Sequence, residues 1–380
     1  MSKHAKHRRT GSNRSEIALV VIARNEAACI ERCLLSVKPH VDRMIVLDTG
    51  STDDTVAIAQ ACGAQVHHFT WVDDFSAARN AALAAANADW NLVLDADEWI
   101  AGGTEELRDA CTFGPLLGVV CIRSEYDISG HVEHSNSWIA RLLPRGVRYK
   151  GRIHEQPVAS TPTAANLQRV RLPLVIGHDG YMNAKLDQKR GRNHALLQQE
   201  LAEHPDDPYV LYQLGKDFEI NLKDPAQAAA HYQRALTTAP KTAPYRHDLC
   251  ICLLACLSKS KQLDAAITLA GEWMEEWANS PDYFYMLGHL MFEAAAQDAA
   301  QAEKQWLPMA ESAFLKCLEI GEQPKLDAAV FGRGSFAAAK YLALTYRAQA
   351  DTLAIKANHF SNLARQMQEN IASAATPVAA

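Results

Sequence analysis

The 380-residue sequence predicts an α/β domain with a mostly parallel, Rossmann-like sheet, followed by an all-α domain of helical repeats. Three observations support this fold class. Short β-branched runs alternate with helix-like segments through the first half of the chain, as is typical of parallel sheets. Polar and acidic residues directly follow several of these runs. From about Leu186 the β-branched runs disappear, and Ala, Leu, Gln and Glu dominate.

The first half contains four apolar runs that are predicted to be strands of one sheet: residues 17–22, 44–47, 65–69 and 91–94. Helices are predicted between them, including segments at residues 55–62 and 75–87. Because α/β sheets bind their ligands outside the carboxyl ends of the strands, we expect a site at that edge. Five chemically useful residues fall at or near it: Arg24, Asp48, Arg79, Asp95 and Asp97.

The segment Asp95-Ala96-Asp97 follows the last of these strands directly. Two carboxylates at a strand's end make a hard, oxygen-rich site, which suits Mg²⁺ or Mn²⁺ and, through the ion, a diphosphate. Such a D-x-D (DXD) motif recurs by chance in many proteins. Its value here comes from the polar residues that end the preceding strands at matching intervals.

Four segments match, in order and in spacing, the motifs of glycosyltransferase family 2, which has the GT-A fold: residues 23–26, 46–53, 73–80 and 94–98. The resemblance covers residues 17–99 and extends through 138–142 and 151–156. The pattern is similar to a subgroup in which this domain is joined to tetratricopeptide (TPR)-like repeats. That subgroup includes enzymes that glycosylate peptides on cysteine, and relatives that build lipopolysaccharide core.

The resemblance implies a role for each motif. Asp48 would face the uracil edge, and Arg79 would lie near the base or the diphosphate. Asp97 would be the direct metal ligand, beside Asp95. The segment after the first strand would contact base and ribose; it consists of Ala23, Arg24, Asn25 and Glu26. The motif after the fourth strand would orient the ribose; it consists of Asp95, Ala96 and Asp97.

Members of family 2 are inverting, so the resemblance implies a base that removes the acceptor's proton. Glu155 is the first candidate, and His154 is a third metal ligand or an acceptor-site residue; Glu98 is the runner-up. The segment at 151–156 differs from the Glu-Asp pair seen in many members. A second polar cluster is formed by His178 and Asp179, and two further residues would shape the donor or acceptor pocket: Trp138 and Arg141.

Plainer interpretations remain open for these residues. Asp48 and Asp53 could be turn or helix-cap residues, and Arg79 a surface helix residue. Asp97 could cap a following helix, and the segment at 151–156 could make structural hydrogen bonds only. Basic residues at 185–192 could reach the phosphates or form a solvated face.

The second half carries a TPR-like pattern. It is clearest in residues 209–240, and the glycines Gly215 and Gly288 lie 73 residues apart, about two repeat lengths. Three to four helical hairpins are predicted, enough for a small solenoid. Its concave groove could receive an acceptor polypeptide, or the domain could be a buttress or a dimerisation surface. Aromatic residues at helical spacing more often pack in a core, but five of them could line the groove: Trp273, Trp277, Tyr283, Phe284 and Tyr285.

Composition limits the class of protein. The net charge of −6 gives no reason to expect nucleic-acid binding, and the nine cysteines show no zinc-type spacing. No apolar run approaches the roughly 20 residues that span a bilayer, and no signal-peptide core is seen. We therefore expect a cytoplasmic protein, and the resemblance implies a bacterial one, with peripheral attachment to the inner membrane as an option. The expected domains are a disordered basic arm (1–15), the GT-A domain (16–195), the TPR-like domain (196–370) and a disordered tail (371–380).

The function expected from the sequence is metal-dependent, inverting transfer of a sugar from a UDP-hexose to a peptide or protein side chain, with Mn²⁺ or Mg²⁺. One alternative acceptor is lipopolysaccharide core or another glycan. An alternative of another class is a non-catalytic TPR scaffold with a degenerate glycosyltransferase domain. A nucleotidyltransferase ranks low, because residues 23–26 lack a Gly-rich basic loop. A homodimer formed through the helical domain is a further option.

Overall fold

The computed structural model describes residues 14–112, 114–128, 131–160, 167–178, 186–326, 328–349 and 354–374. It divides into two compact units, Met1–Ile122 with Trp138–Gly180, and Arg123–Ser137 with Tyr181–Ala380. Several sequence-based expectations lie outside the described residues: most of the basic arm, the end of the C-terminal tail, Asp179 and Lys185.

The sheet of the first unit begins with four parallel strands in the spatial order β3-β2-β1-β4. They are β1 (Ile17–Ala23), β2 (Arg43–Asp48), β3 (Gln65–His68) and β4 (Trp90–Asp95), which confirms the four predicted strands to within one or two residues. The parallel register places Ala23 beside Asp48 and Ile22 beside Asp95. The polar residues that follow these strands therefore share one edge.

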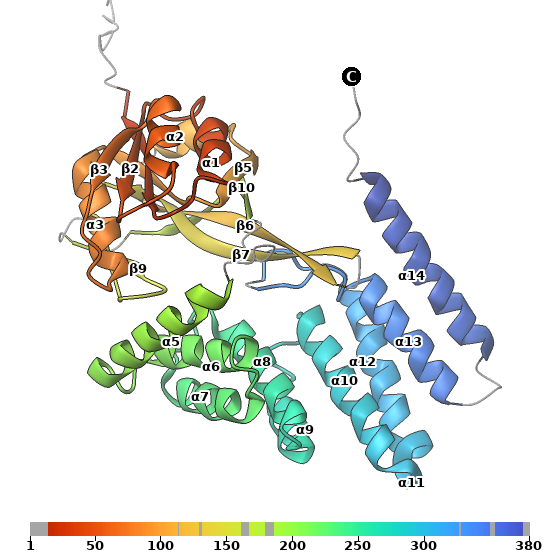
Figure 1. Ribbon diagram of the computed structural model, residues 1–380. Helices are drawn as coiled ribbons and strands as arrows, with labels where there is room; N and C mark the ends of the chain where they lie inside the picture. Colours follow the sequence, from red (N-terminus) through yellow and green to blue (C-terminus); the bar gives the residue numbers. More distant parts are fainter. Residues whose placement is uncertain are drawn as a thin grey trace, which may run out of the picture. The chain divides into compact units, whose positions relative to one another are not determined.

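Four more strands complete the eight-stranded sheet in the order β7-β6-β10-β5 (Figure 1). They are β5 (Glu98–Gly102), β6 (Leu117–Ile128), β7 (His131–Pro144) and β10 (Arg169–His178). β7 is antiparallel to β4, and β5 is antiparallel to β10, in addition to the parallel strands expected from the sequence. A separate hairpin is formed by β8 (Val147–Lys150) and β9 (Gln156–Ala159).

Helices cover both faces of this sheet. Successive residues of β1 point to opposite faces and so enter two different cores. Ile17, Leu19 and Val21 pack in one core with α1 (Ile30–Val37) and α2 (Thr55–Ala61). Ala18 and Val20 pack in the other core with the alanines of α3 (Phe75–Ala86). A short helix, α4 (Leu107–Ala110), joins the first core. Burial on both faces explains why the strand sequences are almost continuously apolar.

The second unit is helical and contains the predicted hairpins. After α5 (Leu186–Glu203), four helix pairs follow in chain order (Figure 1). They are α6 (Pro208–Ile220) with α7 (Pro225–Thr238), α8 (Arg246–Lys259) with α9 (Leu263–Glu272), α10 (Pro281–Gln297) with α12 (Leu307–Ile320), and α13 (Phe336–Ala348) with α14 (Ala354–Ala374). A three-residue helix, α11 (Ala299–Gln301), and a π-helical turn (Ala302–Trp306) lie between α10 and α12.

Large aromatic rings lie against the repeat glycines and set the distance between paired helices. A Cβ on Gly215 would lie 2.3 Å from the ring of Tyr232, and one on Gly288 would lie 2.6 Å from the ring of Phe314. Both rings are fully buried. Any larger residue at either glycine would therefore push the helices of a hairpin apart.

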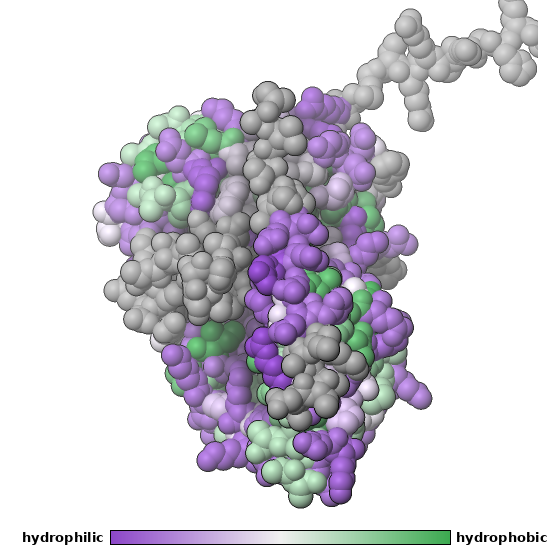
Figure 2. Space-filling view, turned by 90° about the vertical axis from the view of Figure 1, so that its right-hand side faces the viewer, coloured by the Kyte–Doolittle hydropathy of each residue, from purple (hydrophilic) through white to green (hydrophobic). Residues whose placement is uncertain are grey.

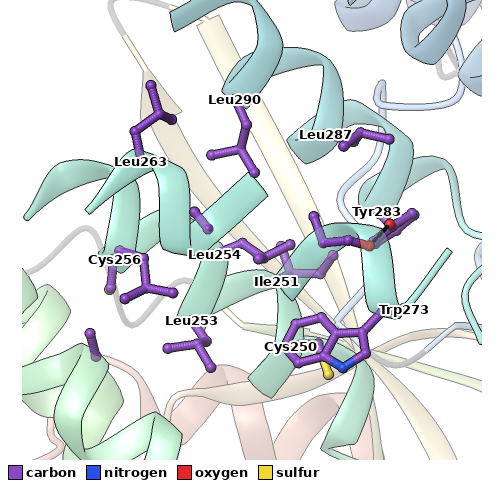
Figure 3. Close-up of a cluster of buried hydrophobic side chains, with 14 of the residues drawn as sticks. Cys250, Ile251, Leu253, Leu254, Cys256, Leu263, Trp273, Tyr283, Leu287 and Leu290 are labelled. Atoms are coloured by element: carbon purple, nitrogen blue, oxygen red, sulfur yellow. Dashed lines mark hydrogen bonds between the residues drawn. The ribbon is translucent and has the colours of Figure 1, made fainter. Parts of the chain in front are cut away.

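Two of the aromatic residues expected to line a groove lie instead in the core. Trp273 is 7% exposed and Tyr283 is fully buried, and both belong to the main hydrophobic cluster of the helical unit (Figure 3). Of the two interpretations open from the sequence, packing in the core therefore holds for these two residues. Helical spacing marks one face of a helix, but it does not tell whether that face meets another helix or solvent.

The surface shown in Figure 2 is mostly hydrophilic among the residues that carry colour, with apolar residues in small separate patches. Single apolar side chains on a surface are usual and need no special explanation. Within the described ranges, no helix combines the length and the apolar character needed to cross a membrane.

Candidate functional site

The loops that follow β1 and β2 are tied to each other by hydrogen bonds. The backbone N–H of Asn25 donates to Ser51 Oγ at 3.0 Å, and the backbone N–H of Thr52 donates to Asn25 Oδ1 at 2.8 Å. The backbone N–H of Glu26 donates to Thr55 Oγ1 at 2.8 Å. Asn25 has a positive φ of 57°, a conformation that Asn tolerates better than most residues. These bonds join the two motifs into one continuous rim at the edge of the sheet.

The start of the first motif is part of the same rim. The backbone N–H of Thr49 donates to the carbonyl oxygen of Ala23 at 2.9 Å, which holds the ends of β1 and β2 together. Arg24 follows directly and its side chain is exposed. The predicted nucleoside-contacting segment therefore combines a fixed backbone with one accessible cationic side chain.

Asp48 holds the turn that follows β2. It is 4% exposed, and its carboxylate accepts hydrogen bonds from the backbone N–H groups of Gly50 (3.2 Å) and Ser51 (3.1 Å). His68 Nδ1 lies 3.3 Å from the same carboxylate. Burial opposes ionisation, but these hydrogen bonds hold the pKa of Asp48 below its usual value. The turn role considered from the sequence is therefore present, and a uracil contact stays a prediction.

The motif around α3 positions both the helix and its neighbour β8. Asp74 is the N-cap, and its side chain accepts a hydrogen bond from the backbone N–H of Ala77 at 2.9 Å. The side-chain amide of Asn80 bonds both backbone groups of Tyr149: its Oδ1 accepts from the N–H at 2.8 Å, and its Nδ2 donates to the carbonyl at 2.9 Å. This pair of bonds fixes α3 against β8.

Arg79 lies on the buried side of α3 and joins two motifs. It is 6% exposed, so the interpretation as a surface helix residue is wrong. Its Nη2 donates to Asp95 Oδ1 at 2.5 Å, and its Nε donates to Glu155. Residues that are 16 and 76 positions away in the chain therefore meet at one guanidinium group.

A second buried guanidinium group, that of Arg141 on β7, holds the other side of the same carboxylate. Arg141 Nη2 donates to Asp95 Oδ2 at 2.8 Å and to Glu98 Oε1 at 2.5 Å. Glu98 Oε2 accepts the backbone N–H of Asp95 at 2.9 Å. Burial opposes ionisation of Asp95, but the two guanidinium groups hold its pKa well below the usual range. Burial raises the pKa of Glu98, although Arg141 opposes the shift.

Asp97 has a different environment. Its side chain is 16% exposed, and its Oδ2 lies 3.7 Å from Nε2 of His178. The pairing of β5 with β10 explains the contact, because it places His178 opposite Glu98, next to Asp97. Burial opposes protonation of His178, but the hydrogen bond and charge of Asp97 raise its pKa. His178 belongs to the second polar cluster predicted from the sequence, and only its position after an apolar run indicated a strand end.

The segment at 151–156 lies against the start of α3. The backbone N–H of Phe75 donates to the carbonyl oxygen of Arg152 at 2.8 Å. His154 is exposed and has a positive φ of 51°. The Glu155 side chain is 9% exposed and accepts from Arg79. The two catalytic candidates in this segment therefore differ: Glu155 is bonded into the network around Asp95, and His154 is exposed.

Among the residues that the structure describes, no three His, Cys, Asp or Glu side chains are gathered in a metal-binding group. The predicted set of Asp95, Asp97 and His154 is therefore not assembled as such. Both oxygens of Asp95 already accept hydrogen bonds from arginine. The pair that the structure does bring together is Asp97 with His178.

Three buried hydrogen-bond donors near this network have no partner in the structure: Arg79 Nη1, Arg141 Nε and the hydroxyl of Tyr149. The Tyr149 ring lies 5.5 Å from the Arg79 guanidinium carbon. Burial raises the pKa of Tyr149 to about 12, so the hydroxyl keeps its proton. Unsatisfied buried donors are rare in native proteins and commonly mark a place where an anion or a water binds.

Comparison with known proteins shows the family to which this fold belongs. Residues 18–178 match the family model of glycosyl transferase family 2. A TPR repeat-containing protein of Synechococcus elongatus is 35% identical over 314 residues, which are 77% of this chain and 77% of the relative. The SPbeta prophage-derived glycosyltransferase SunS of Bacillus subtilis is 26% identical over 268 residues, or 68% of this chain. The aligned part is 63% of SunS, less than two thirds of its length.

Among solved structures, a crystal structure of MamA is similar to 50% of this chain and 94% of its own, with 17% identity and a TM-score of 0.38.

Proposed function

The chain belongs to glycosyltransferase family 2, in a form joined to TPR-like repeats, and on that premise we propose a specific reaction for it. The proposal is metal-dependent, inverting transfer of a hexose from a UDP-sugar to a side chain of a peptide or protein. One observation carries it: the paired arginines around Asp95 lie next to the partly exposed Asp97–His178 pair. Two guanidinium groups, each held by carboxylates, and a metal-ligand pair adjoin each other at the carboxyl end of β4, where such sheets bind nucleotides.

Two side chains, those of Asp97 and His178, could contribute ligands to a divalent ion. The Asp97 carboxylate and the His178 imidazole are close enough that a small adjustment would let both ligate one ion, and a mixed oxygen and nitrogen set suits Mn²⁺ at least as well as Mg²⁺. A bound ion would neutralise charge on the leaving nucleoside diphosphate. Asp95 would then serve to hold Arg79 and Arg141 rather than to ligate the ion directly. Ligation by His154 stays a prediction.

The chain's own residues supply the rest of the donor site. Arg79 and Arg141 are locked by carboxylates in the free protein, so their positive charge is in place before the donor arrives. Their unpartnered N–H groups and the Tyr149 hydroxyl are donors suited to diphosphate oxygens. The rim formed by residues 23–26 and 48–55 is proposed to hold base and ribose, with Asp48 at the uracil edge.

Glu155 remains the proposed base. A base must be ionised and must reach the acceptor's proton. The guanidinium group of Arg79 donates a hydrogen bond to Glu155 and fixes its position. Glu98, the runner-up, is 3% exposed and uses both oxygens on Arg141 and the Asp95 backbone. It is therefore better placed to orient Asp95 than to meet an acceptor.

A screen of nucleotide sugars tests the proposal. Thermal stabilisation and slow hydrolysis would be measured with UDP-, GDP- and dTDP-hexoses, with and without Mn²⁺ or Mg²⁺. A UDP-hexose should stabilise the protein only with metal, and Asp97→Ala should abolish the effect. Asp206→Ala, which removes an exposed carboxylate of the helical unit, is the matched control.

Acceptor class would be tested next with the active donor, offering peptides with Ser, Thr or Cys beside lipopolysaccharide-core oligosaccharides. Transfer to oligosaccharides alone would favour the glycan alternative. No donor binding under any condition would favour the non-catalytic scaffold.

A further inference from the structure

A pocket of about 600 Å³ lies in the helical unit, where α10 and α12 of one hairpin meet the chain that follows α9 (Figure 1). It shares no residue with the candidate site described above. Its volume lies within the range of small-molecule sites. The residues that α12 contributes recur at the spacing of one helix face; they are Pro308, Met309, Ser312, Ala313 and Lys316.

The wall of this pocket is mainly apolar. Leu287 and Ala313 are 8% and 4% exposed, and Phe284 is half-buried. Met274 and Met309, also in the wall, are 46% and 44% exposed. Large apolar side chains that gather around one hollow differ from single ones scattered on a surface, and they commonly mark an interaction site. Because methionine is unbranched and flexible, it adapts to a ligand that has no fixed shape.

The charge of the pocket is positive. Its wall contains two lysines, Lys304 and Lys316, and no carboxylate. The ammonium group of Lys316 is paired with Glu319 at 2.8 Å, so Lys316 offers the pocket mainly its methylene stem. Lys304 is exposed and makes no ion pair with any residue that the structure describes. One uncompensated cation suits a singly charged anion better than a doubly charged phosphate.

An unusual backbone turn places this cation at one end of the pocket. Lys304 lies in the π-helical turn Ala302–Trp306, where the backbone N–H of Leu307 donates to the carbonyl oxygen of Ala302. Such turns are rare and frequently occur at functional sites. The helix face on α12 then runs from Pro308 to Lys316, a rise of roughly 12 Å. The pocket therefore has a cationic end followed by a long apolar wall.

We propose that this pocket binds the monomeric anion of a fatty acid, with its carboxylate beside Lys304 and its acyl chain along α12 against Met274 and Met309. A polypeptide would need a hydrogen-bond partner for every backbone group it buried, and the wall has few to offer. A membrane surface is held by several basic residues rather than by one. The inference goes beyond the proposed glycosyl transfer and does not depend on it.

Calorimetric titration of the full-length protein with decanoate and dodecanoate, each below its micelle concentration, tests the class of ligand. Burial of the chain should lower the Kd by roughly fourfold for each added methylene group. Dodecyltrimethylammonium has the same tail and the opposite charge, and it should bind at least fivefold more weakly than dodecanoate. Lys304→Gln should remove this preference for the anion. Lys241→Gln, which removes an exposed lysine outside the pocket, should keep it.

A second arm tests the place of binding. Ser312→Trp puts an indole ring into the pocket from an exposed position of α12, and Gln233→Trp adds the same ring at an exposed position of α7 as the matched control. Dodecanoate binding should weaken at least tenfold in Ser312→Trp and stay unchanged in Gln233→Trp, with equal helix content by circular dichroism.

Four results would overturn the inference. They are absence of dodecanoate binding, equal Kd values for the anionic and cationic amphiphiles, undiminished binding by Ser312→Trp, and co-sedimentation with phosphatidylglycerol vesicles by a protein that does not bind the monomer. The last result would assign the pocket to a membrane surface instead.

Discussion

At the residue scale, one carboxylate organises the candidate site. Asp95 is held by Arg79 on one side and Arg141 on the other, and Glu98 bonds both Arg141 and the Asp95 backbone. Buried charges are stable only when each has a partner, so removal of one member leaves the others uncompensated. The network should therefore contribute to folding as well as to donor binding.

Arg141→Met tests this dependence. The substitution keeps an apolar side chain of similar length but leaves Asp95 and Glu98 without one guanidinium group. We expect the free energy of unfolding to fall by about 3–5 kcal/mol, as measured by urea denaturation. In the matched control, Arg145→Met removes an ion pair with Asp89 in which both side chains are more than half exposed, and should cost less than about 1 kcal/mol. Equal losses in the two variants would contradict the account.

His289 gives the helical unit a dependence on pH. Burial and the nearby Arg333 lower its pKa to about 4, from 6.5 in an unfolded chain. Tyr285 on the same helix and Tyr341 on α13 also face its ring. The folded state resists protonation, so the unfolded state binds more protons between these pH values and stability falls as pH drops from about 6.5 to 4.

The size of this loss in stability follows from the shift in the pKa of His289. A shift from 6.5 to about 4 lowers the free energy of unfolding by about 3 kcal/mol at most. His289→Gln should remove that part of the pH dependence, which chemical denaturation at a series of pH values would show. If the difference in the free energy of unfolding between the wild-type protein and His289→Gln were the same at pH 7 and at pH 4, the assignment would be contradicted.

At the element scale, the predictable features are those that residues close together in the sequence determine. The four strands, α2 and α3 follow from apolar runs and turn residues that lie next to each other in the sequence. The Asp97–His178 contact joins residues 81 positions apart through the pairing of β5 with β10, and no local pattern carries that register. Arg141 met Asp95 in the same way, through β7 beside β4. Motif residues were therefore predictable one by one, but their partners were not.

The repeat glycines lead to a prediction about helix pairing. Gly215→Ala would bring a methyl group against the ring of Tyr232, and we expect a loss of about 1–3 kcal/mol in the free energy of unfolding. Gly271→Ala, on α9, meets nothing within 4 Å and should be neutral or stabilise by up to about 1 kcal/mol. Thermal unfolding of the two variants side by side decides the point. Equal effects would mean that the glycines do not set the spacing of the hairpins.

At the scale of the whole molecule, a family 2 glycosyltransferase domain and a TPR-like domain are carried on one chain. The division into an α/β part and a helical part was evident from the change in composition near Leu186, because β-branched runs and Ala-rich segments favour different backbones. The sequence left open whether Trp273 and Tyr283 line a groove or pack in the core, because periodicity does not distinguish the two surroundings. Every residue that is assigned to the proposed donor site lies in the α/β unit.

The most direct test of the central claim is calorimetric titration of UDP into the full-length protein, with and without Mn²⁺. The account predicts binding that requires the ion, weakens at least tenfold in Asp97→Ala and in His178→Ala, and is unchanged in Asp206→Ala. Binding that is equally tight without metal, or that survives Asp97→Ala, would contradict the assignment of Asp97 and His178 as the metal-holding pair of a glycosyltransferase site.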